Sequence, residues 1–225
     1  MYNIKFEEKL EKNKSKLRHK IQSMAWLLVV ITIFGGIKYP ILGYIVPLVM
    51  LTGLVGSIFH GRFVCGWLCP RGAFFDRIVS RISPHKKIPE FFRNYNFRWI
   101  VFAVLMGLMA LQIAFDVSNP YHWGAVFVRI CVITTLIALV VAIIYHPRTW
   151  CSFCPMGTLQ SVIGGHKKPL KMREGCVKCR ICEMECPINL QIIDHFKGGV
   201  YQSKDCLKCS VCIEACPKDV LYFNE

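Results

Sequence analysis

The sequence has few charged residues, and acidic residues are the scarcest of them. Only 19% of its 225 residues are charged, and 14 Asp and Glu stand against 28 Lys and Arg. With 54% hydrophobic residues and a mean hydropathy of +0.40, the chain is more apolar than the surface of a soluble domain usually allows. This composition excludes a disordered chain, collagen and a coiled coil.

Two signals are absent from the sequence. No G-x-G-x-x-G motif follows a strand-like segment, so no nicotinamide or flavin fingerprint is present. No small-residue cleavage site follows the first apolar run either. We therefore expect residues 1–20 to be a retained, basic cytoplasmic tail and not a signal peptide.

Four apolar segments are long enough to cross a membrane, whose hydrocarbon core of about 30 Å needs roughly 20 apolar helical residues. They cover residues 21–37, 41–59, 97–115 and 126–145. Pro47 lies inside the second segment and is expected to interrupt it. The sequence therefore predicts an all-α transmembrane four-helix bundle over residues 21–163.

The basic residues are placed as a membrane topology requires. Residues 1–174 have a net charge of +15 and residues 175–225 a net charge of −1. Seven basic residues lie in the tail and seven in the segment 60–96, whereas the loop 116–125 has none. The positive-inside rule then places both termini in the cytoplasm, in a multi-pass protein of the inner cell membrane with lipid as a partner. We expect no nucleic acid partner.

The segment after a linker at 164–174 has the bacterial ferredoxin pattern C-x-x-C-x-x-C-x-x-x-C-P twice. Three closely spaced cysteines wrap one cluster, and the fourth, followed by proline, reaches the other cluster. Residues 175–225 are therefore expected to form an α+β bacterial 2[4Fe–4S] ferredoxin-like domain. The first predicted [4Fe–4S] ligand set is Cys176, Cys179, Cys182 and Cys216, and the second is Cys206, Cys209, Cys212 and Cys186.

Zinc is the main alternative for these cysteines, because it also binds four thiolates from paired C-x-x-C elements. A zinc site uses two pairs, whereas each group here adds a third cysteine and a Cys-Pro step. Disulfides do not fit the reducing cytosol that the predicted topology gives this domain. The pattern favours iron–sulfur clusters.

A second pair of cysteine motifs follows the second and fourth apolar segments, at residues 60–74 and 146–159. Both read H-x-R-x-x-C and then C-P-x-G, and they differ by one residue between the cysteines. Since each follows a two-helix hairpin, we expect two parallel helical-hairpin repeats with both motifs at the cytoplasmic surface. The candidate third redox-metal site consists of Cys65, Cys69, Cys151 and Cys154.

Soft sulfur ligands favour an iron–sulfur cluster or Cu(I) at this third site, and a reactive dithiol pair is another alternative. The plainest alternative is that these cysteines are small buried residues at tight turns. His60 and His146 are candidate metal ligands or proton donors beside a quinone, or cap helix C-termini. The remaining motif residues are expected as follows: Arg62 and Arg148 as inner-surface anchors, Trp67 and Trp150 as interfacial residues, Gly72 and Gly157 as turn residues, and the separate Cys131 as core.

Four spans, two membrane Cys-Pro motifs and a double ferredoxin pattern together resemble the NapH-type membrane-bound 4Fe–4S ferredoxin family. The membrane motifs are also similar to those of NosR and CcoG. The resemblance covers roughly residues 20–225. It implies electron transfer between a quinone pool, or a cytoplasmic donor, and a partner in or beyond the membrane. In CcoG-like proteins, such motifs are associated with copper reduction.

Three functional hypotheses follow. The first is a membrane-bound electron-transfer subunit of an oxidoreductase, with a quinol dehydrogenase component as one form. It passes electrons between a cytoplasmic donor or the quinone pool and a membrane or extracytoplasmic redox partner. The second is a copper reductase or metalloenzyme assembly factor that uses the paired membrane motifs. The third is a redox sensor or scaffold without turnover.

Overall fold

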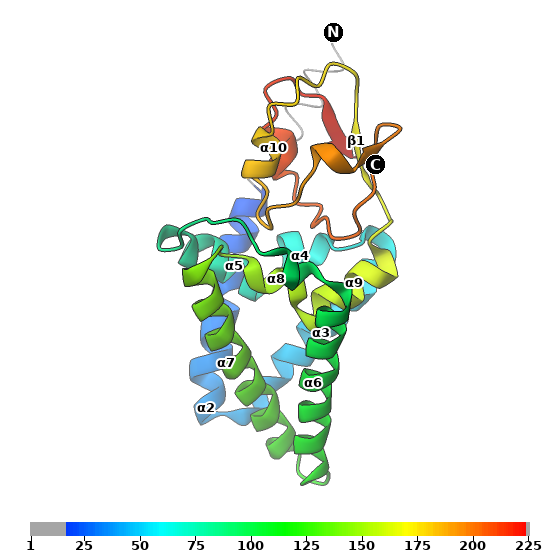
Figure 1. Ribbon diagram of the computed structural model, residues 1–225. Helices are drawn as coiled ribbons and strands as arrows, with labels where there is room; N and C mark the ends of the chain where they lie inside the picture. The colour runs from blue at the N-terminus through cyan, green and yellow to red at the C-terminus, as the bar shows by residue number, and fades with distance from the viewer. Residues whose placement is uncertain (1–16, 224–225) are drawn as a thin grey trace.

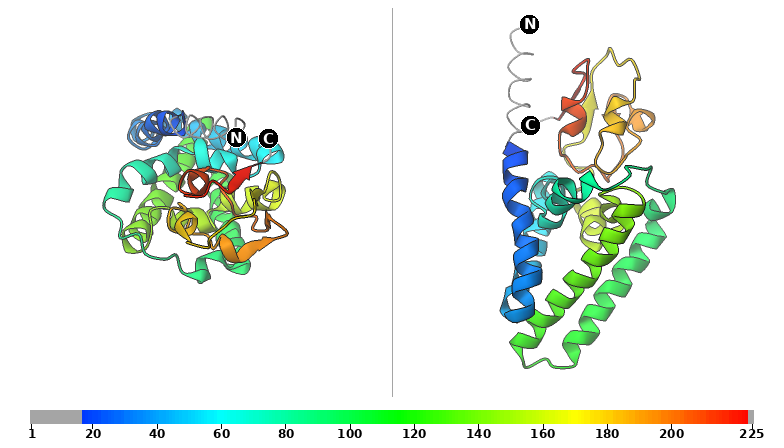
Figure 2. Two further views of the ribbon diagram at one scale, coloured as in Figure 1. Left: turned by 90° about the horizontal axis from the view of Figure 1, so that it is seen from above. Right: turned by 90° about the vertical axis from the view of Figure 1, so that its left-hand side faces the viewer.

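The computed structural model describes residues 17–223. Most of the predicted basic tail, residues 1–16, and residues 224–225 lie outside the described part of the chain. Long helices form one end of the molecule and a small domain of short helices and strands caps the other (Figure 1). The first described residue of the chain and the capping domain lie at the same end of the helices (Figure 2).

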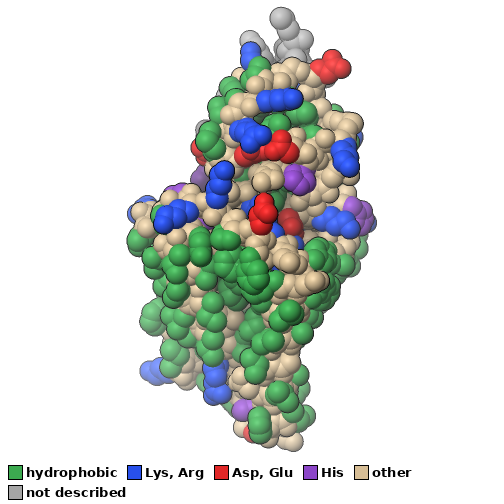
Figure 3. Space-filling view, viewed as in Figure 1, with side chains coloured by type: hydrophobic (Ala, Val, Ile, Leu, Met, Phe, Trp, Pro, Cys, Tyr) green, Lys and Arg blue, Asp and Glu red, His purple; other side chains and the backbone are tan. Residues whose placement is uncertain are grey.

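Four helices are long and apolar enough to cross a membrane, at Leu17–Lys38, Pro40–His60, Tyr95–Ala114 and Pro120–Ile144. The first contains a π-helical turn, η1 (Ile31–Gly35), and ends in α2 (Gly36–Lys38), and the second consists of a 3-10 turn, η2 (Pro40–Tyr44), followed by α3 (Ile45–His60). The third and fourth are α6 (Tyr95–Ala114) and α7 (Pro120–Ile144). Hydrophobic side chains cover the helical end, whereas most charged side chains lie at or above its junction with the capping domain (Figure 3).

Pro47 does not break the second helix in its middle. It lies in the first turn of α3, directly after η2, where a missing backbone N–H removes little helical bonding. Next to it, a Cβ atom on Gly43 would lie 2.1 Å from the carbonyl oxygen of Gly124 in α7. Such close backbone approach requires glycine, and it packs the two hairpins together at this end.

Four short helices carry the membrane cysteine motifs: α4 (Phe63–Trp67), α5 (Pro70–Arg77), α8 (Thr149–Phe153) and α9 (Pro155–Gly164). Cys69 and Cys154 are the N-cap residues of α5 and α9, and each is followed by a proline at the first helical position. Proline fits there because that N–H has no helical partner. The Cys-Pro step therefore starts a new helix in both motifs. Between them, η3 (Val79–Arg81) and η4 (Glu90–Arg93) lead to α6.

The capping domain has a four-stranded antiparallel sheet in the order β2-β3-β1-β4. Its two short helices are α10 (Ile181–Met184) and α11 (Val211–Glu214), and each follows the first two cysteines of one ferredoxin run and contains the third. The remaining elements are β1 (Leu170–Met172), η5 (Ile193–His195), β2 (Phe196–Lys197), β3 (Val200–Tyr201) and β4 (Leu221–Phe223).

The segment 164–174, expected to be a linker, differs from that expectation. It contains β1, an inner strand that pairs with β3 on one side and β4 on the other. Leu170 is buried in the core of the capping domain. A three-residue strand between basic residues carries too short a pattern to be read from sequence, and its pairing partners lie about 30 and 50 residues away.

Candidate iron–sulfur sites

The cysteines of the two ferredoxin runs gather around two small cavities in the capping domain. One cavity is lined by Cys176, Cys179, Cys182 and Cys216, and the other by Cys186, Cys206, Cys209 and Cys212. Each cavity thus combines three cysteines of one run with the fourth cysteine of the other run. The structure brings together the same two groups that the sequence pattern predicts. All 13 cysteines lie in the described part of the chain, and none of them forms a disulfide.

The backbone of both runs has the same unusual conformation. Six non-glycine residues adopt a left-handed conformation with φ between 50° and 62°, at matching positions of the two runs. Alternation of left-handed and right-handed residues turns successive backbone N–H groups to one side and forms an anion-binding concavity of the kind found at Fe–S sites. The residues are Lys178, Arg180 and Asn189 in the first run, and Lys208, Ser210 and Asp219 in the second.

Buried thiols line these cavities. Burial raises the pKa of Cys182 to about 11 and of Cys186 to about 12. The N–H groups of Leu190 and Ile188 act in the opposite direction at Cys186, because they stabilise its thiolate. A thiolate there consequently needs a bound cation. The donor set, the two cavities and the N–H concavities fit [4Fe–4S] clusters, which are anionic groups held by thiolates.

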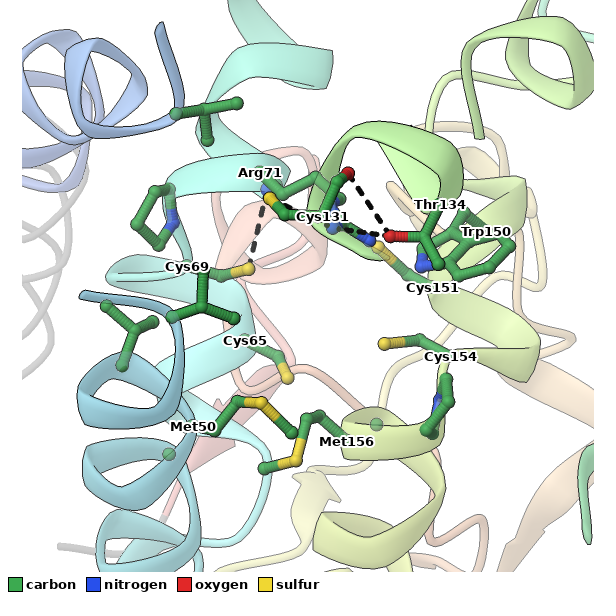
Figure 4. Close-up of a pocket in the computed structure, with 18 of the residues that line it drawn as sticks. Met50, Cys65, Cys69, Arg71, Cys131, Thr134, Trp150, Cys151, Cys154 and Met156 are labelled. Atoms are coloured by element: carbon green, nitrogen blue, oxygen red, sulfur yellow. Dashed lines mark hydrogen bonds between the residues drawn. The ribbon is translucent and has the colours of Figure 1, made fainter. Parts of the chain in front are cut away.

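A third and larger cavity, about 210 Å³, lies between the helices beneath the capping domain. All four membrane-motif cysteines line it, and Cys131 of α7 lines it as well. Figure 4 shows the sulfur atoms of Cys65, Cys151 and Cys154 turned toward one space. Within residues 17–223, no three His, Cys, Asp or Glu side chains form a group that could hold a single metal ion.

The rest of this cavity has two different surfaces. Met50 and Met156 lie beside Cys65 and Cys154 and present thioether sulfurs (Figure 4). Farther along the helices the lining is apolar and includes Leu28, Val49, Leu105, Met109 and Phe127. The cavity therefore joins a sulfur-rich end at the membrane surface to an apolar end between the spanning helices.

Two buried N–H groups at this cavity have no hydrogen-bond partner among the described residues: Trp150 Nε1 and Arg62 Nε. Both residues line the cavity. A buried donor without an acceptor costs about 1–3 kcal/mol, so these donors fit an occupant that accepts hydrogen bonds, such as thiolate or sulfide sulfur. Gln160 adds a third polar group, because its Oε1 lies 3.0 Å from the sulfur of Cys65.

The two motif arginines are buried and cross between the motifs. Arg62 is 0% exposed and Arg148 is 1% exposed, so the expectation that they are surface anchors was wrong. Arg62 donates from Nη2 to the carbonyl oxygen of Cys151 at 2.9 Å, and Arg148 donates from Nη1 to that of Cys65 at 2.9 Å. The sequence does not reveal these contacts, because the partners are 89 and 83 residues apart.

The glycines of the C-P-x-G motifs make room for these arginines. A Cβ atom on Gly157 would lie 2.6 Å from Arg62 Nη2, and one on Gly72 would lie 3.1 Å from the Arg148 guanidinium. Neither glycine has a positive φ. The expectation that they are turn residues was therefore wrong. Glycine is needed at both positions because a guanidinium group lies close to the backbone.

Asp76 is the carboxylate that pairs with Arg148. Arg148 donates two hydrogen bonds to it, at 2.7 and 2.6 Å, and Arg18 Nη2 and Gln22 Nε2 each donate at 3.1 Å. Burial alone would raise the pKa of Asp76, but Arg148 and Arg18 together hold it below its ordinary value. This carboxylate ties the first helix to both cysteine motifs.

Burial also raises the pKa of the Cys65 and Cys151 thiols to about 12 each. The largest opposing effect is Arg62 at Cys65 and Arg148 at Cys151, because a nearby positive charge favours the thiolate. The two cysteines therefore have equivalent electrostatic surroundings: each thiol is buried and lies near the arginine of its own motif. A soft cation or cluster would be needed to keep them ionised.

The two histidines lie apart from the cysteine cavity and neither lines it. His60 is exposed beside the ring of Phe63, and His146 is buried beside His85. Trp67 and Trp150, expected at the interface, are both buried. Trp67 Nε1 donates to the carbonyl oxygen of Lys208 in the capping domain, at 3.1 Å. Packing against a second domain, which sequence reading did not anticipate, removes the Trp67 ring from the membrane surface. Trp150 is buried among the helices instead, in a cluster with Phe75 and Phe153.

Sequence reasoning missed Asp76, Gln160 and Asp205 as residues of the site. A signal for Asp76 exists, because Asp76, Glu90 and Asp116 are the only acidic residues between positions 12 and 173. A lone carboxylate beside a basic cysteine motif is a candidate for a buried ion pair. No comparable signal marks Gln160 or Asp205.

Two protein families match the chain. A family described as 4Fe-4S binding domain matches residues 42–89 and, a second time, residues 128–173. Each match contains one membrane cysteine motif. A family described as 4Fe-4S dicluster domain matches residues 175–221, which contain both ferredoxin runs.

Individual relatives come from archaea and bacteria. An uncharacterized protein of Methanocaldococcus jannaschii is 27% identical over 170 residues, 67% of this chain and 66% of the relative. The methylamine utilization ferredoxin-type protein MauN of Methylorubrum extorquens is 30% identical over 141 residues, 56% of this chain and 47% of MauN. YccM of Escherichia coli, named for electron transport, is 24% identical over 172 residues, 64% of this chain and 46% of YccM.

The matches span between 46% and 66% of the length of these three relatives. No solved structure matches the chain. The family matches, the relatives and the four apolar helices agree with one another. This chain is an iron–sulfur electron-transfer protein with ferredoxin-type 4Fe–4S domains and four helices suited to a membrane.

Proposed function

We propose that this protein is an inner-membrane electron-transfer subunit of the NapH type. It passes electrons between a cytoplasmic donor or the quinone pool and a redox partner in or beyond the membrane. The observation that carries the proposal is the position of the two ferredoxin cavities directly above a cysteine-lined cavity at the ends of the membrane helices. Cys65 and Cys151 pack against the core of the capping domain.

The capping domain would hold two [4Fe–4S] clusters, each of which supplies reversible one-electron transfer when bound. The proposed ligands are the two cysteine groups that line the separate cavities. The left-handed residues of each run aim backbone N–H groups at the cluster position, which raises its reduction potential. Burial in the apolar core excludes water from the second cavity, which is enclosed by Leu170, Ile188 and Leu207.

The membrane cysteine cavity would hold a third redox group, for which an iron–sulfur cluster is the first candidate. Four converging cysteines, the unpartnered N–H groups of Trp150 and Arg62, and the nearby guanidinium of Arg71 support an anionic occupant. Arg71 Nη2 donates to Thr134 Oγ1 at 2.9 Å, and no carboxylate pairs with it among the described residues. The match of the 4Fe-4S binding family to both motif regions supports the same proposal.

The proposed architecture consists of two parallel hairpin repeats. The double match of one family and the reciprocal contacts of Arg62 and Arg148 support it. Both ends of the described chain lie at the basic end of the helices, which supports cytoplasmic N- and C-termini.

Metal content and spectroscopy test this function. Protein purified without oxygen is expected to contain about eight irons per chain from the capping domain, and about twelve if the third group is another cubane. A redox-titrated EPR spectrum of C65S/C151S should lose only the signals of the third group. C131S is the matched control, because Cys131 lines the same cavity but belongs to neither motif. Iron-free protein that is folded would contradict the proposal.

Copper reduction is the second candidate function. Met50 and Met156 support it, because thioether and thiolate sulfur together favour Cu(I). In this case the purified protein would contain only capping-domain iron, and Cu(II) would oxidise its reduced clusters. M50L/M156L should weaken Cu(I) binding while leaving iron content unchanged. Unchanged Cu(I) binding in this variant would exclude the two thioether sulfurs as Cu(I) ligands.

Quinone is proposed as a ligand of the apolar end of the large cavity. The lining residues Leu105, Met109 and Phe127 lie at membrane depth and offer an apolar slot. Met109→Trp should fill this slot and slow cluster reduction by a quinol analogue, while reduction by dithionite stays at the wild-type rate. Equal rates with the quinol analogue in both proteins would exclude this slot as its site.

A further inference from the structure

Two carboxylates, Asp76 and Asp205, hold the two halves of the membrane domain in similar ways. Each carboxylate accepts hydrogen bonds from one arginine of a membrane motif and from one arginine near the start of a spanning helix. Asp76 binds Arg148 and Arg18, at 2.6 and 3.1 Å. Asp205 binds Arg62 and Arg98, at 3.1 and 2.9 Å.

The four arginines of these two Arg-Asp-Arg groups are all buried. Arg18 is 7% exposed, and Arg62, Arg98 and Arg148 are at most 1% exposed. A buried guanidinium without a carboxylate is strongly destabilising, so each pair of arginines requires its acid. Both groups also lie next to membrane-motif cysteines, through the bonds of Arg62 and Arg148 to cysteine carbonyl oxygens.

The two carboxylates come from different domains. Asp76 lies seven residues after Cys69 in the first motif. The residue seven positions after Cys154 in the second motif is Ser161. Ser161 is buried and its Oγ accepts from Arg98 Nη2 at 3.2 Å, so it occupies the corresponding place without a charge. The missing carboxylate is that of Asp205, from the capping domain.

Asp205 directly precedes Cys206, a proposed cluster ligand. The same loop makes further contacts with the first membrane motif and with the segment 164–174. Trp67 donates to the Lys208 carbonyl oxygen, and Lys208 Nζ donates to the Lys168 carbonyl oxygen at 2.7 Å. A Cβ atom on Gly66 would lie 2.3 Å from the Leu207 carbonyl oxygen, so the two backbones are in direct contact.

We propose that Asp205 is a positioning residue that completes the second half of the membrane domain. Its carboxylate replaces the acid that Ser161 does not provide, and in doing so it fixes the Cys206–Cys209 loop on the membrane cysteine cavity. The ion pairs of Asp205 then hold this loop next to Cys65 and Cys151 in the folded protein. This inference rests on the proposed function only for the identity of the group that the loop holds.

The test uses the whole protein, purified without oxygen in detergent, and measures trypsin cleavage after Lys167 together with the reduction potentials of the capping-domain clusters. Asp205→Asn should speed this cleavage by about tenfold to a hundredfold, because it unpairs two buried arginines and frees the domain. It should also raise the potential of the cluster at Cys206 and not that of the cluster at Cys176, because it removes a negative charge beside Cys206. Asp205→Glu, which keeps the charge, should restore most of both properties.

Asp194→Asn is the matched control. Asp194 lies in the same domain and pairs with Arg180, but both residues are exposed. Cleavage after Lys167 and the potential of the cluster at Cys206 should therefore stay at wild-type values. Equal cleavage rates for Asp205→Asn and Asp194→Asn would overturn the proposal.

A double variant separates charge compensation from domain attachment. Asp205→Asn with Ser161→Asp places an acid at the position equivalent to Asp76. It should restore the thermal midpoint and yield that Asp205→Asn loses, while cleavage after Lys167 stays fast. Slow cleavage in the double variant would show that Asp205 does not attach the domain, and no recovery of yield would show that the two positions are not equivalent. Iron content is measured in parallel, so a wild-type protein without clusters would contradict the proposed function while leaving the cleavage comparison intact.

Discussion

Arg62 and Arg148 each bind the membrane motif to which the other belongs, and each donates a hydrogen bond of 2.9 Å to a cysteine carbonyl oxygen there. Each guanidinium therefore holds the opposite cysteine loop, and neither loop can be positioned alone. The arrangement makes the cysteine cavity a product of both hairpins. Its stability should depend on charges that lie outside the cavity itself.

The first prediction concerns Arg148. Arg148→Ala leaves the partly buried Asp76 without its main partner and should destabilise the protein by about 3–5 kcal/mol. Thermal unfolding in detergent measures the change. Arg148→Ala/Asp76→Ala should be less destabilised than the sum of the single variants, because the unpaired charge is gone. The exposed Arg81, replaced by alanine, is the control and should change stability by less than about 0.5 kcal/mol. Additive effects of Arg148 and Asp76 would refute the coupling.

The second prediction concerns the motif glycines. Gly157→Ala should cost about 1–3 kcal/mol, because its Cβ would meet Arg62 Nη2 at 2.6 Å and that guanidinium is pinned by Cys151 and Asp205. Gly72→Ala should cost less, because its nearest contact is 3.1 Å. Gly107 in α6 has nothing within 4 Å, so Gly107→Ala should be neutral or stabilising. A reversed order in thermal unfolding would contradict this account.

The third prediction concerns the unpartnered indole N–H of Trp150. Trp150→Phe keeps an aromatic ring but removes the donor, and should lower the reduction potential of the third group by about 40 mV, equivalent to one hydrogen bond of about 1 kcal/mol. The two capping-domain potentials should not move. Trp123→Phe is the control, because its Nε1 is also buried and unpartnered but does not line the cavity. Identical shifts in the two variants would mean that the effect is not local.

The fourth prediction concerns pH. Burial, aided by His85, lowers the pKa of His146 to about 4, whereas a histidine in the unfolded chain titrates near 6.5. Between these values the unfolded chain binds a proton that the folded protein does not, so stability should fall as the pH falls from about 6.5 toward 4. Asp76, whose pKa is lowered, contributes its own loss only below about pH 4.

His146→Gln should flatten this pH dependence, and thermal midpoints across the same range measure it. His166→Gln at an exposed position is the control and should keep the wild-type slope. If His146→Gln keeps that slope as well, another group is responsible.

The sequence predicted the spanning helices and the ferredoxin domain because both have local patterns. Runs of apolar residues mark the four helices, and fixed cysteine spacing marks the two loops. The boundaries differ by a few residues, as at the first helix, which extends back to Leu17.

The surroundings of the membrane cysteines could not be predicted in the same way. Arg62 looks like a surface anchor because its position follows a span, but it is buried and its partner Asp205 is 143 residues away. The rings of Trp67 and Trp150 suit an interface, but Trp67 contacts the capping domain and Trp150 packs among the helices. Interactions between distant segments decide these roles, and one sequence contains no periodic signal for them.

The inner strand β1 has a practical consequence for transferring the capping domain to another protein. A ferredoxin cassette cut at the first cysteine would leave behind the strand that joins both halves of its sheet. A transferable unit must instead begin before Leu170, within the short stretch that follows α9. Fusions made at that junction should fold, and those made five residues later should not.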